Sequence, residues 1–184
     1  MLHKINKEPL DCSDHSVSYT PEALLDIAYF TSPLGIVICY FSPEGHLTQC
    51  RPIEMDEAPS QLEKCLQQSL SKHPTLANAL WTCTPPPAEY APVMPHVRWA
   101  PHFWELLAQV PFGTTLSYGE LAQLNGLNKN QSRAIGRLLG TNPIIILYPC
   151  HRIIRSNGEL GGYRWGLERK EALLQYEASN SGLG

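Results

Sequence analysis

Cys150 is the residue of this sequence with the clearest capacity for covalent chemistry. It lies in the stretch "NPIIILYPCHRIIRSNGELGGY", between Pro149 and His151 and after a strongly apolar run. The thiolate is the reactive form of cysteine, and an unperturbed thiol has a pKa of about 8.5, so only a small fraction is ionised at neutral pH. A neighbouring histidine could act as a base, and a carboxylate such as Glu177 could hold its far ring nitrogen.

The same pattern admits other interpretations of Cys150. It could be a small buried apolar residue, a metal ligand or a nucleophile, and the neighbouring residues by themselves favour a buried structural thiol. Six cysteines occur, at positions 12, 39, 50, 65, 83 and 150, with no C-x-x-C pair and no zinc-finger spacing. We therefore expect free thiols in a reducing intracellular compartment, with no metal and no cofactor.

The elements that position these residues divide into two parts. "PPPAEYAPVMP" holds five prolines in eleven residues. It predicts a linker without regular structure over about 85–95, between an N-terminal domain (1–90) and a C-terminal domain (96–184). In the first part we expect an extended arm over 1–20, then three strands ("IAYFT", "IVICYF", "HLTQCRPI") joined by turns, and a helix over "PSQLEKCLQQSLSKH".

The second part predicts a mostly helical domain. Helical spacing of apolar residues occurs in "APHFWELLAQV", "SYGELAQLNG", "NKNQSRAIGRLLGTN" and "GLERKEALLQYEA". Ser117 is a good N-cap for the second of these helices and Gly126 a good stop. The second and third helices suggest a helix-turn-helix, and "PIIILY" predicts a buried strand or extended run before Cys150.

Charge is distributed unevenly along the chain. Residues 1–118 carry 6 Lys+Arg against 12 Asp+Glu, whereas residues 119–184 carry 8 against 5. The basic excess near Cys150 is compatible with a surface that faces phosphate. The N-terminus is polar and no apolar run reaches about 18 residues, so we expect an intracellular protein, cytoplasmic or associated with the nucleoid, that does not contact a membrane.

The ordered segments around Cys150 resemble one known family. "PCHRI", preceded by "NP" and followed by "GELGGYRWGLERKEALL", together with "VPFGTTLSYGELA", "SRAIGRLLG" and "LLQYE", closely resembles the O6-alkylguanine-DNA alkyltransferases. The resemblance covers residues 98–177, and more loosely the strand region. It implies an α+β protein, with a small ribonuclease H-like α/β domain (three strands and a helix) before a mostly helical, winged helix-turn-helix-like domain.

The resemblance also implies roles for five residues. Cys150 would accept the alkyl group from O6 of guanine, or from O4 of thymine, in one irreversible displacement. His151, through a water, and Glu177 would keep its thiolate available. Tyr118 would give a proton to the departing guanine, and Asn142 would donate hydrogen bonds near the thiol.

DNA contacts follow from the same resemblance. The second helix of the helix-turn-helix would enter the minor groove of double-stranded DNA and extrude the damaged base, with Arg133 filling its place in the stack. The protein would act as a monomer in the absence of DNA. Further groove or phosphate contacts would come from Lys129, Gln131, Ser132 and Arg137, and the base pocket would be walled by Ile153, Tyr163, Arg164 and Trp165.

Several departures and alternatives remain open at this point. Gln131 and Ser132 stand where relatives often carry small apolar residues, and Arg164 and Trp165 add bulk that bears on the size of alkyl group accepted. A non-catalytic lesion-binding protein of the same fold is the main alternative, although such proteins replace the reactive cysteine. A helix-turn-helix regulator or a cysteine hydrolase would explain fewer of these segments.

Overall fold

The computed structural model describes residues 26–90 and 92–181, so the arm expected over 1–20 lies outside the described residues. Two clusters of buried apolar side chains form the interior of this part of the chain. One surrounds a three-stranded sheet and the other lies among the helices of the second half. The α+β class expected from the sequence is confirmed, whereas the finer likeness to ribonuclease H and the exact domain boundary stay predictions.

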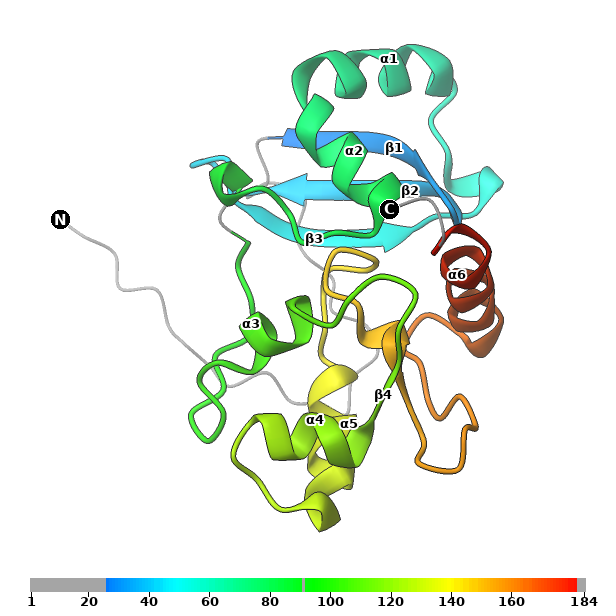
Figure 1. The fold of residues 1–184 in the computed structure, drawn as a ribbon. Helices are drawn as coiled ribbons and strands as arrows, with labels where there is room; N and C mark the ends of the chain where they lie inside the picture. Colours follow the sequence, from blue (N-terminus) through cyan, green and yellow to red (C-terminus); the bar gives the residue numbers. More distant parts are fainter. Residues whose placement is uncertain (1–25, 91, 182–184) are drawn as a thin grey trace, which may run out of the picture.

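The sheet is an antiparallel meander of β1 (Asp26–Ser32), β2 (Gly35–Phe41) and β3 (Leu47–Pro52). Gly35 has a φ of +89°, which a glycine adopts without strain, and it closes the hairpin between β1 and β2. Two helices, α1 (Leu62–Lys72) and α2 (Pro74–Thr82), pack against β1 (Figure 1). The strands and α1 match the prediction; α2, which begins with proline in its first turn, was not predicted.

The proline-rich segment is fixed to the sheet, and the prediction that it holds no regular structure is wrong at one point. Residues Ala88–Tyr90 form a single 3-10 turn, η3, in which the Tyr90 N–H donates to the carbonyl of Pro87 at 3.0 Å. One such turn is compatible with prolines because they stand before it, where no N–H is needed. The Tyr90 side chain is buried, and the Val93 N–H donates to the Leu47 carbonyl at 2.9 Å.

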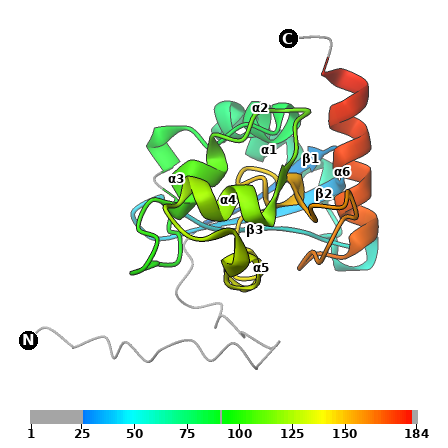
Figure 2. The ribbon, with the colours of Figure 1, turned by 60° about the horizontal axis from the view of Figure 1, so that its bottom comes forward.

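The second half contains α3 (Phe103–Ala108), α4 (Tyr118–Leu124), η4 (Lys129–Gln131), α5 (Ser132–Leu139) and α6 (Leu167–Asn180). Ser117 caps α4 as expected, because its Oγ accepts the Glu120 N–H at 3.1 Å. Figures 1 and 2 show α4 and α5 side by side, with α6 at one edge. No described helix is long and apolar enough to cross a bilayer.

Two short strands brace this half near the reactive turn. Leu116–Ser117 (β4), just before α4, pairs in parallel with Ile153–Ile154 (β5). The residues after Cys150 are therefore hydrogen-bonded to the start of the helix-turn-helix, which fixes Tyr118 relative to the turn.

The apolar run before Cys150 is buried but is not a strand. Residues 144–147 are all fully buried, yet only Ile144 pairs with the sheet, opposite Cys50, and the chain then turns. Ile146 has a φ of +68°, an uncommon conformation for a β-branched residue. Burial was predicted correctly, and the extended conformation is wrong beyond Ile144, because packing against the sheet overrides the β propensity of the run.

This run should contribute strongly to stability. Ile145→Ala is expected to lower the free energy of unfolding by about 2–5 kcal/mol, because it leaves a cavity beside the sheet. Ile27→Ala, at a β1 side chain that is 46% exposed, is the control and should lose much less. Chemical denaturation of both variants measures the difference, and equal small losses would contradict the structural role assigned to the run.

Candidate active site

Cys150 opens a one-turn 3-10 helix, η5 (Cys150–Arg152), at the boundary between the sheet and the helices. Its side chain is 5% exposed and borders a pocket of about 490 Å³, called the Cys150 pocket below. The pocket is lined by residues of α4, α5, η5 and the following loop: Tyr118, Ser132, Arg133, Gly136, Leu139, Gly140, Cys150, Arg155, Gly161, Gly162, Tyr163 and Arg164. A nearly buried thiol thus faces a cavity of the size that small ligands occupy.

Asn142 directs a hydrogen-bond donor at the sulfur. Its Nδ2 donates to Cys150 Sγ at 3.1 Å and to the Tyr148 carbonyl at 3.0 Å, while its Oδ1 accepts the Ile144 N–H at 3.0 Å. These three partners fix the orientation of the amide. Burial raises the pKa of the Cys150 thiol, and the Asn142 hydrogen bond and the charge of Lys170 oppose that effect.

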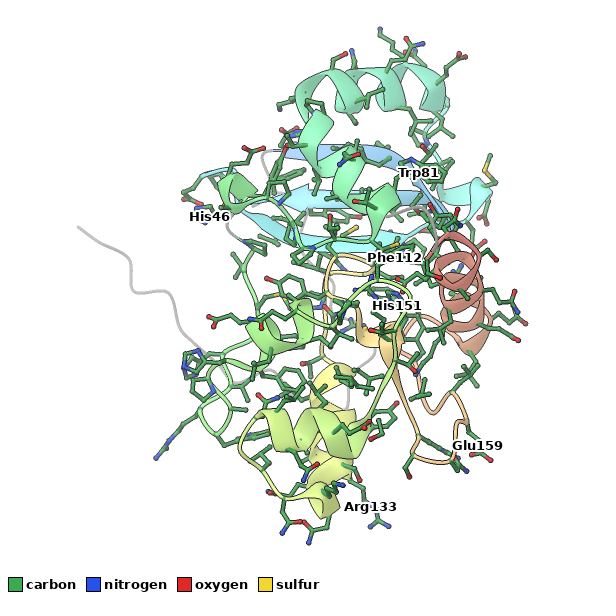
Figure 3. All side chains as sticks on the ribbon, viewed as in Figure 1. His46, Trp81, Phe112, Arg133, His151 and Glu159 are labelled. Carbon is green, nitrogen blue, oxygen red and sulfur yellow. The ribbon has the colours of Figure 1, made fainter. Side chains whose placement is uncertain are left out.

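His151 points away from the pocket towards α6, where its Nε2 lies 2.8 Å from Glu177 Oε1 (Figure 3 labels His151 in the interior). Burial lowers the pKa of His151, although Glu177 opposes the shift, so the imidazole is neutral. An ionised carboxylate can only accept, so the proton of the neutral ring must be on Nε2. Nδ1 is then an unprotonated acceptor, and it is buried without a hydrogen-bond partner among the described residues.

Arg152 completes a buried charged cluster with Glu177. Its Nε donates to both carboxylate oxygens, at 3.1 and 2.9 Å, and its Nη2 donates to Oε1 at 2.8 Å. The rest of the guanidinium donates to the carbonyls of Val110 (2.5 Å) and Cys83 (2.8 Å). Burial alone would raise the pKa of Glu177, but its hydrogen bonds and charges with His151 and Arg152 lower it to about 2.

Tyr118 lies against the loop that closes the Cys150 pocket. Its hydroxyl donates to the Gly162 carbonyl at 3.3 Å, and burial raises its pKa, so the phenol keeps its proton at neutral pH. Gly161 has a φ of +69°, and a Cβ there would come within 2.7 Å of the Tyr118 hydroxyl. A glycine is therefore required for the loop to approach the ring.

The structure distributes the other predicted pocket residues between two environments. Tyr163 and Arg164 line the pocket; the Tyr163 hydroxyl is buried without a partner in the described part of the chain, and an Arg164 Nη1 donates to the Gly140 carbonyl at 3.4 Å. Ile153 and Trp165 are absent from that lining. Ile153 is buried in the helical cluster, and Trp165 packs against the sheet-side cluster with Arg164 lying 5.1 Å over its ring.

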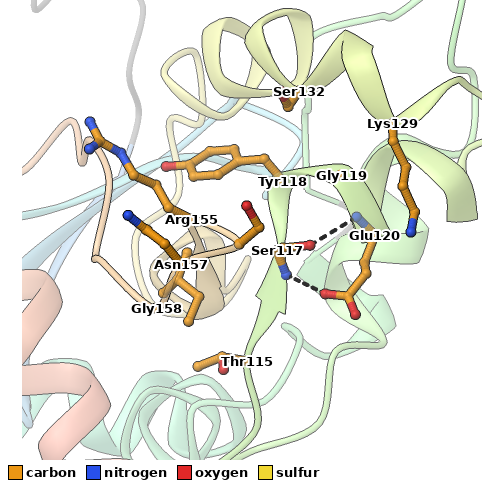
Figure 4. Close-up of a pocket in the computed structure, with 12 residues that line it drawn as sticks. Thr115, Ser117, Tyr118, Gly119, Glu120, Lys129, Ser132, Arg155, Asn157 and Gly158 are labelled. Carbon is orange, nitrogen blue, oxygen red and sulfur yellow. Dashed lines mark hydrogen bonds between the residues drawn. The ribbon is translucent and has the colours of Figure 1, made fainter.

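A second hollow of about 730 Å³ adjoins the Cys150 pocket and shares Tyr118, Ser132 and Arg155 with it. Figure 4 shows the Tyr118 side chain between Arg155 and Ser132, with Lys129 at the opposite rim. This wall mixes polar and apolar groups and also includes the residues Ser117, Glu120, Ser156 and Asn157. Lys129 and several hydroxyl groups could donate hydrogen bonds to an anion there, but the wall also carries the Glu120 carboxylate, and Arg155 is paired with Glu159.

The predicted DNA-contacting residues lie on the exposed side of this region. Arg133 lines the Cys150 pocket and lies at the end of the molecule far from the sheet (Figure 3). Ser132 lines both hollows and Lys129 only the second. Gln131 and Arg137 are exposed but line neither, and Gln131 Oε1 accepts the Asn128 N–H at 2.9 Å.

The described residues offer no evident metal site, since no three His, Cys, Asp or Glu side chains among them come together as ligands. In and beside the pocket the structure brings together a thiol, an amide donor, a neutral imidazole, a phenol and nearby cations.

Similarity to known proteins is greatest in the second half of the chain. Residues 99–179 match the family model described as "6-O-methylguanine DNA methyltransferase, DNA binding domain". Relatives named methylated-DNA--protein-cysteine methyltransferase include one from Methanosarcina acetivorans, 49% identical over 76 residues (41% of this chain, 48% of that protein). An inducible one from Bacillus subtilis is 47% identical over 75 residues (40% and 41%). These matches span less than half of the curated relatives' length.

Solved structures extend the likeness to both halves. The structure of Mycobacterium tuberculosis OGT in complex with DNA has a TM-score of 0.62 and 31% sequence identity, and the match covers 83% of this chain and 93% of that one. The chain belongs to the O6-methylguanine-DNA methyltransferase family. This membership confirms the resemblance found in the sequence motifs. The structural match to the O6-methylguanine-DNA methyltransferase fold includes the sheet as well as the helices.

Two buried cations near Cys150, Arg152 and Lys170, were not predicted from the sequence to have a role in this methyltransferase-family protein. Lys170, Leu173 and Glu177 are the buried residues of α6, and their spacing of three and four places them on one face of the helix. Two charged residues on the same helical face as a leucine could have indicated from the sequence that these charges are buried. For Arg152 the only sequence indication was weaker: it directly follows the Cys-His pair.

Glu177→Gln tests the buried charged cluster. It is expected to lower the free energy of unfolding by about 3–5 kcal/mol at neutral pH, because Arg152 loses its buried counter-charge. Glu171→Gln, at an exposed position of the same helix, should stay within about 0.5 kcal/mol of wild type.

The stabilising contribution of the Glu177 carboxylate should depend on pH. The pKa of Glu177 is lowered from an ordinary 4.5 to about 2, so its contribution is present above 4.5 and is lost as the pH falls towards 2. Denaturation curves at several pH values should show the gap between wild type and Glu177→Gln narrowing across that window. A gap independent of pH would contradict an ionised Glu177.

Proposed function

We propose that the protein repairs alkylated DNA by transferring an alkyl group from O6 of guanine, or O4 of thymine, in duplex DNA to Cys150. The observation that carries this proposal is the nearly buried Cys150 thiol at the pocket, with the Asn142 amide 3.1 Å from its sulfur and the His151–Glu177 pair behind it. This arrangement suits a single displacement by a thiolate.

The reaction follows from the positions of the groups. The Cys150 proton passes through a water to His151 Nδ1, the ring nitrogen that Glu177 leaves free. The sulfur lone pair then forms a bond to the alkyl carbon, and the bond from that carbon to O6 breaks. Tyr118, whose phenol is protonated, gives a proton to the guanine so that it leaves as a neutral base.

One molecule should act once. The product on Cys150 is a thioether, which offers water no good leaving group, so the active thiol is not regenerated. We further propose that the protein is a monomer in the absence of DNA, as the family resemblance implies.

Duplex DNA would bind across α5 and the two hollows. A guanine inside a duplex is reached only when it is extruded, and Arg133, which lines the Cys150 pocket, would fill the vacated stack from the minor groove. Lys129 and Arg155 on the second hollow would contact phosphates flanking the extruded nucleotide. Binding would weaken steeply with salt and show little sequence preference. The activity would take place inside the cell, where this substrate occurs.

The transfer is tested by mass. After incubation with a duplex containing O6-methylguanine, the Cys150 peptide should gain one methyl group, with one equivalent transferred per protein. Cys150→Ser should still bind the duplex and gain nothing. Binding without any methyl gain in the wild type would instead indicate a lesion-binding protein, and repeated turnover would indicate a hydrolase.

Arg133→Ala separates base extrusion from chemistry. We expect transfer from duplex DNA to slow by about tenfold or more, since extrusion costs a few kcal/mol, while reaction with the free base O6-benzylguanine changes little. Arg98→Ala, which removes the same charge at an exposed position outside both hollows, is the control. Equal losses on duplex and free base would show that Arg133 is structural.

A further inference from the structure

Lys170 is a fully buried lysine on the inner face of α6. Its ammonium donates to three backbone carbonyls, those of Ile153 at 2.5 Å, Leu160, and Gly162 at 3.4 Å. Within the described residues it forms no ion pair with a carboxylate. Burying a charge without a counter-charge is expensive, so this lysine calls for an explanation beyond packing.

The three acceptors lie on both sides of the Cys150 pocket. Ile153 directly follows η5, whereas Leu160 and Gly162 belong to the loop that closes the pocket. The Gly162 carbonyl also accepts the Tyr118 hydroxyl, and the Lys170 ammonium lies 5.8 Å from the centre of the Tyr118 ring. One cation is thus linked to the wall of the pocket and to the proposed proton donor.

The charge of Lys170 also acts on the nucleophile. It lowers the pKa of the Cys150 thiol, and the thiolate in turn favours the charged lysine. Asn142 supplies only a neutral donor, and Arg152 is already neutralised by Glu177. Lys170 is therefore a fully buried positive charge beside the pocket that no described carboxylate balances, and a thiolate at Cys150 is an anion that would balance it.

We propose that Lys170 is a positioning residue that holds the pocket loop and Tyr118 in place through three carbonyls and favours the Cys150 thiolate with its charge. The expected effect of Lys170 on alkyl transfer rests on the proposed function. Its effect on the reactivity of the Cys150 thiol does not, because that reactivity can be measured without DNA. A lysine suits the task because its three N–H donors match three acceptors, whereas a planar guanidinium directs its donors in a fixed fork.

Titratable and charged groups surround Lys170 and Cys150 on several elements. His151 lies beside Cys150 on η5, Tyr118 comes from α4 and Tyr163 from the loop, and the Arg152–Glu177 pair lies behind His151. Two exposed or paired cations, Arg155 and Arg164, also line the pocket and are unchanged in every variant. Burial lowers the pKa of Lys170 to about 8, and the thiolate opposes that shift. The tyrosines have raised pKa values and stay neutral, so a change in the Cys150 titration on removal of Lys170 reports the loss of its charge.

The experiment compares the full-length protein with Lys170→Met, Lys170→Arg and, as a control, Lys64→Met at an exposed position of α1. Circular dichroism first establishes that each variant is folded. The rate at which iodoacetamide modifies Cys150, read from the mass of its peptide between about pH 6 and pH 10, then reports the reactivity of the thiol without any DNA. Single-turnover transfer from an O6-methylguanine duplex is measured in parallel.

Lys170→Met should slow Cys150 modification about tenfold at neutral pH, where the ammonium of the wild type is charged. The difference should narrow above about pH 8, where Lys170 loses its proton. The variant should slow methyl transfer further, because Tyr118 and the loop also lose their support. Lys170→Arg should keep the wild-type modification rate at neutral pH and still slow transfer at least tenfold. Lys64→Met should match wild type in both measurements.

An unchanged modification rate at neutral pH in folded Lys170→Met would overturn the proposal. If that variant does not fold, Lys170→Arg decides: a modification rate near wild type with slow transfer supports the proposal, and a modification rate reduced tenfold despite the retained charge overturns it. A wild type that modifies normally with iodoacetamide but never accepts a methyl group would refute the proposed function, while the modification rates would still decide whether Lys170 acts on Cys150.

Discussion

The structure around Cys150 depends on the buried carboxylate of Glu177. It accepts from His151, from Arg152 and, through Oε2, from the Gly113 N–H at 3.0 Å, so one side chain joins α6 to two other segments, η5 and the loop at Gly113. Arg152 extends the connection to the carbonyls of Val110 and Cys83. A buried ion pair of this kind is weak evidence for stability, but it fixes a single arrangement, because either partner alone would be an unpaired buried charge.

This arrangement makes the two halves of the chain cooperate in one site. The carbonyl of Cys83, at the end of α2, and the fully buried run before Cys150 both belong to the sheet side. Tyr118, Arg133 and the closing loop belong to the helical side, and Cys150 borders the cavity between α4, α5 and that loop. The sheet thus does more than support the helices, since it anchors the turn that presents the thiol.

Much of this was readable from the sequence, and the failures have physical causes. The three strands, the Ser117 cap and the pairing of His151 with Glu177 followed from local patterns or from the family motifs. The path of 144–147 did not, because packing on the sheet forces a turn on residues that favour strands. Trp165 packs against the sheet-side cluster and does not line the pocket, and no local sequence pattern encodes such a tertiary contact.

The two buried cations show most clearly what the sequence alone does not predict. The sequence shows Arg152 and Lys170 as ordinary charges near a cysteine. Only the fold reveals that Arg152 is paired with a carboxylate, whereas Lys170 is hydrogen-bonded to carbonyls and has no described counter-charge. A cation paired with a carboxylate has a structural role, whereas a buried cation without a counter-charge could favour a nearby thiolate.

We propose that the Glu177 carboxylate makes His151 a base for Cys150. The most direct test is the pH dependence of single-turnover methyl transfer from an O6-methylguanine duplex in wild type and in Glu177→Gln, with duplex affinity measured alongside. The variant should bind the duplex as wild type does, transfer at least tenfold more slowly at neutral pH, and recover part of the rate as the pH rises. Equal rates and equal pH profiles in a folded variant would contradict it.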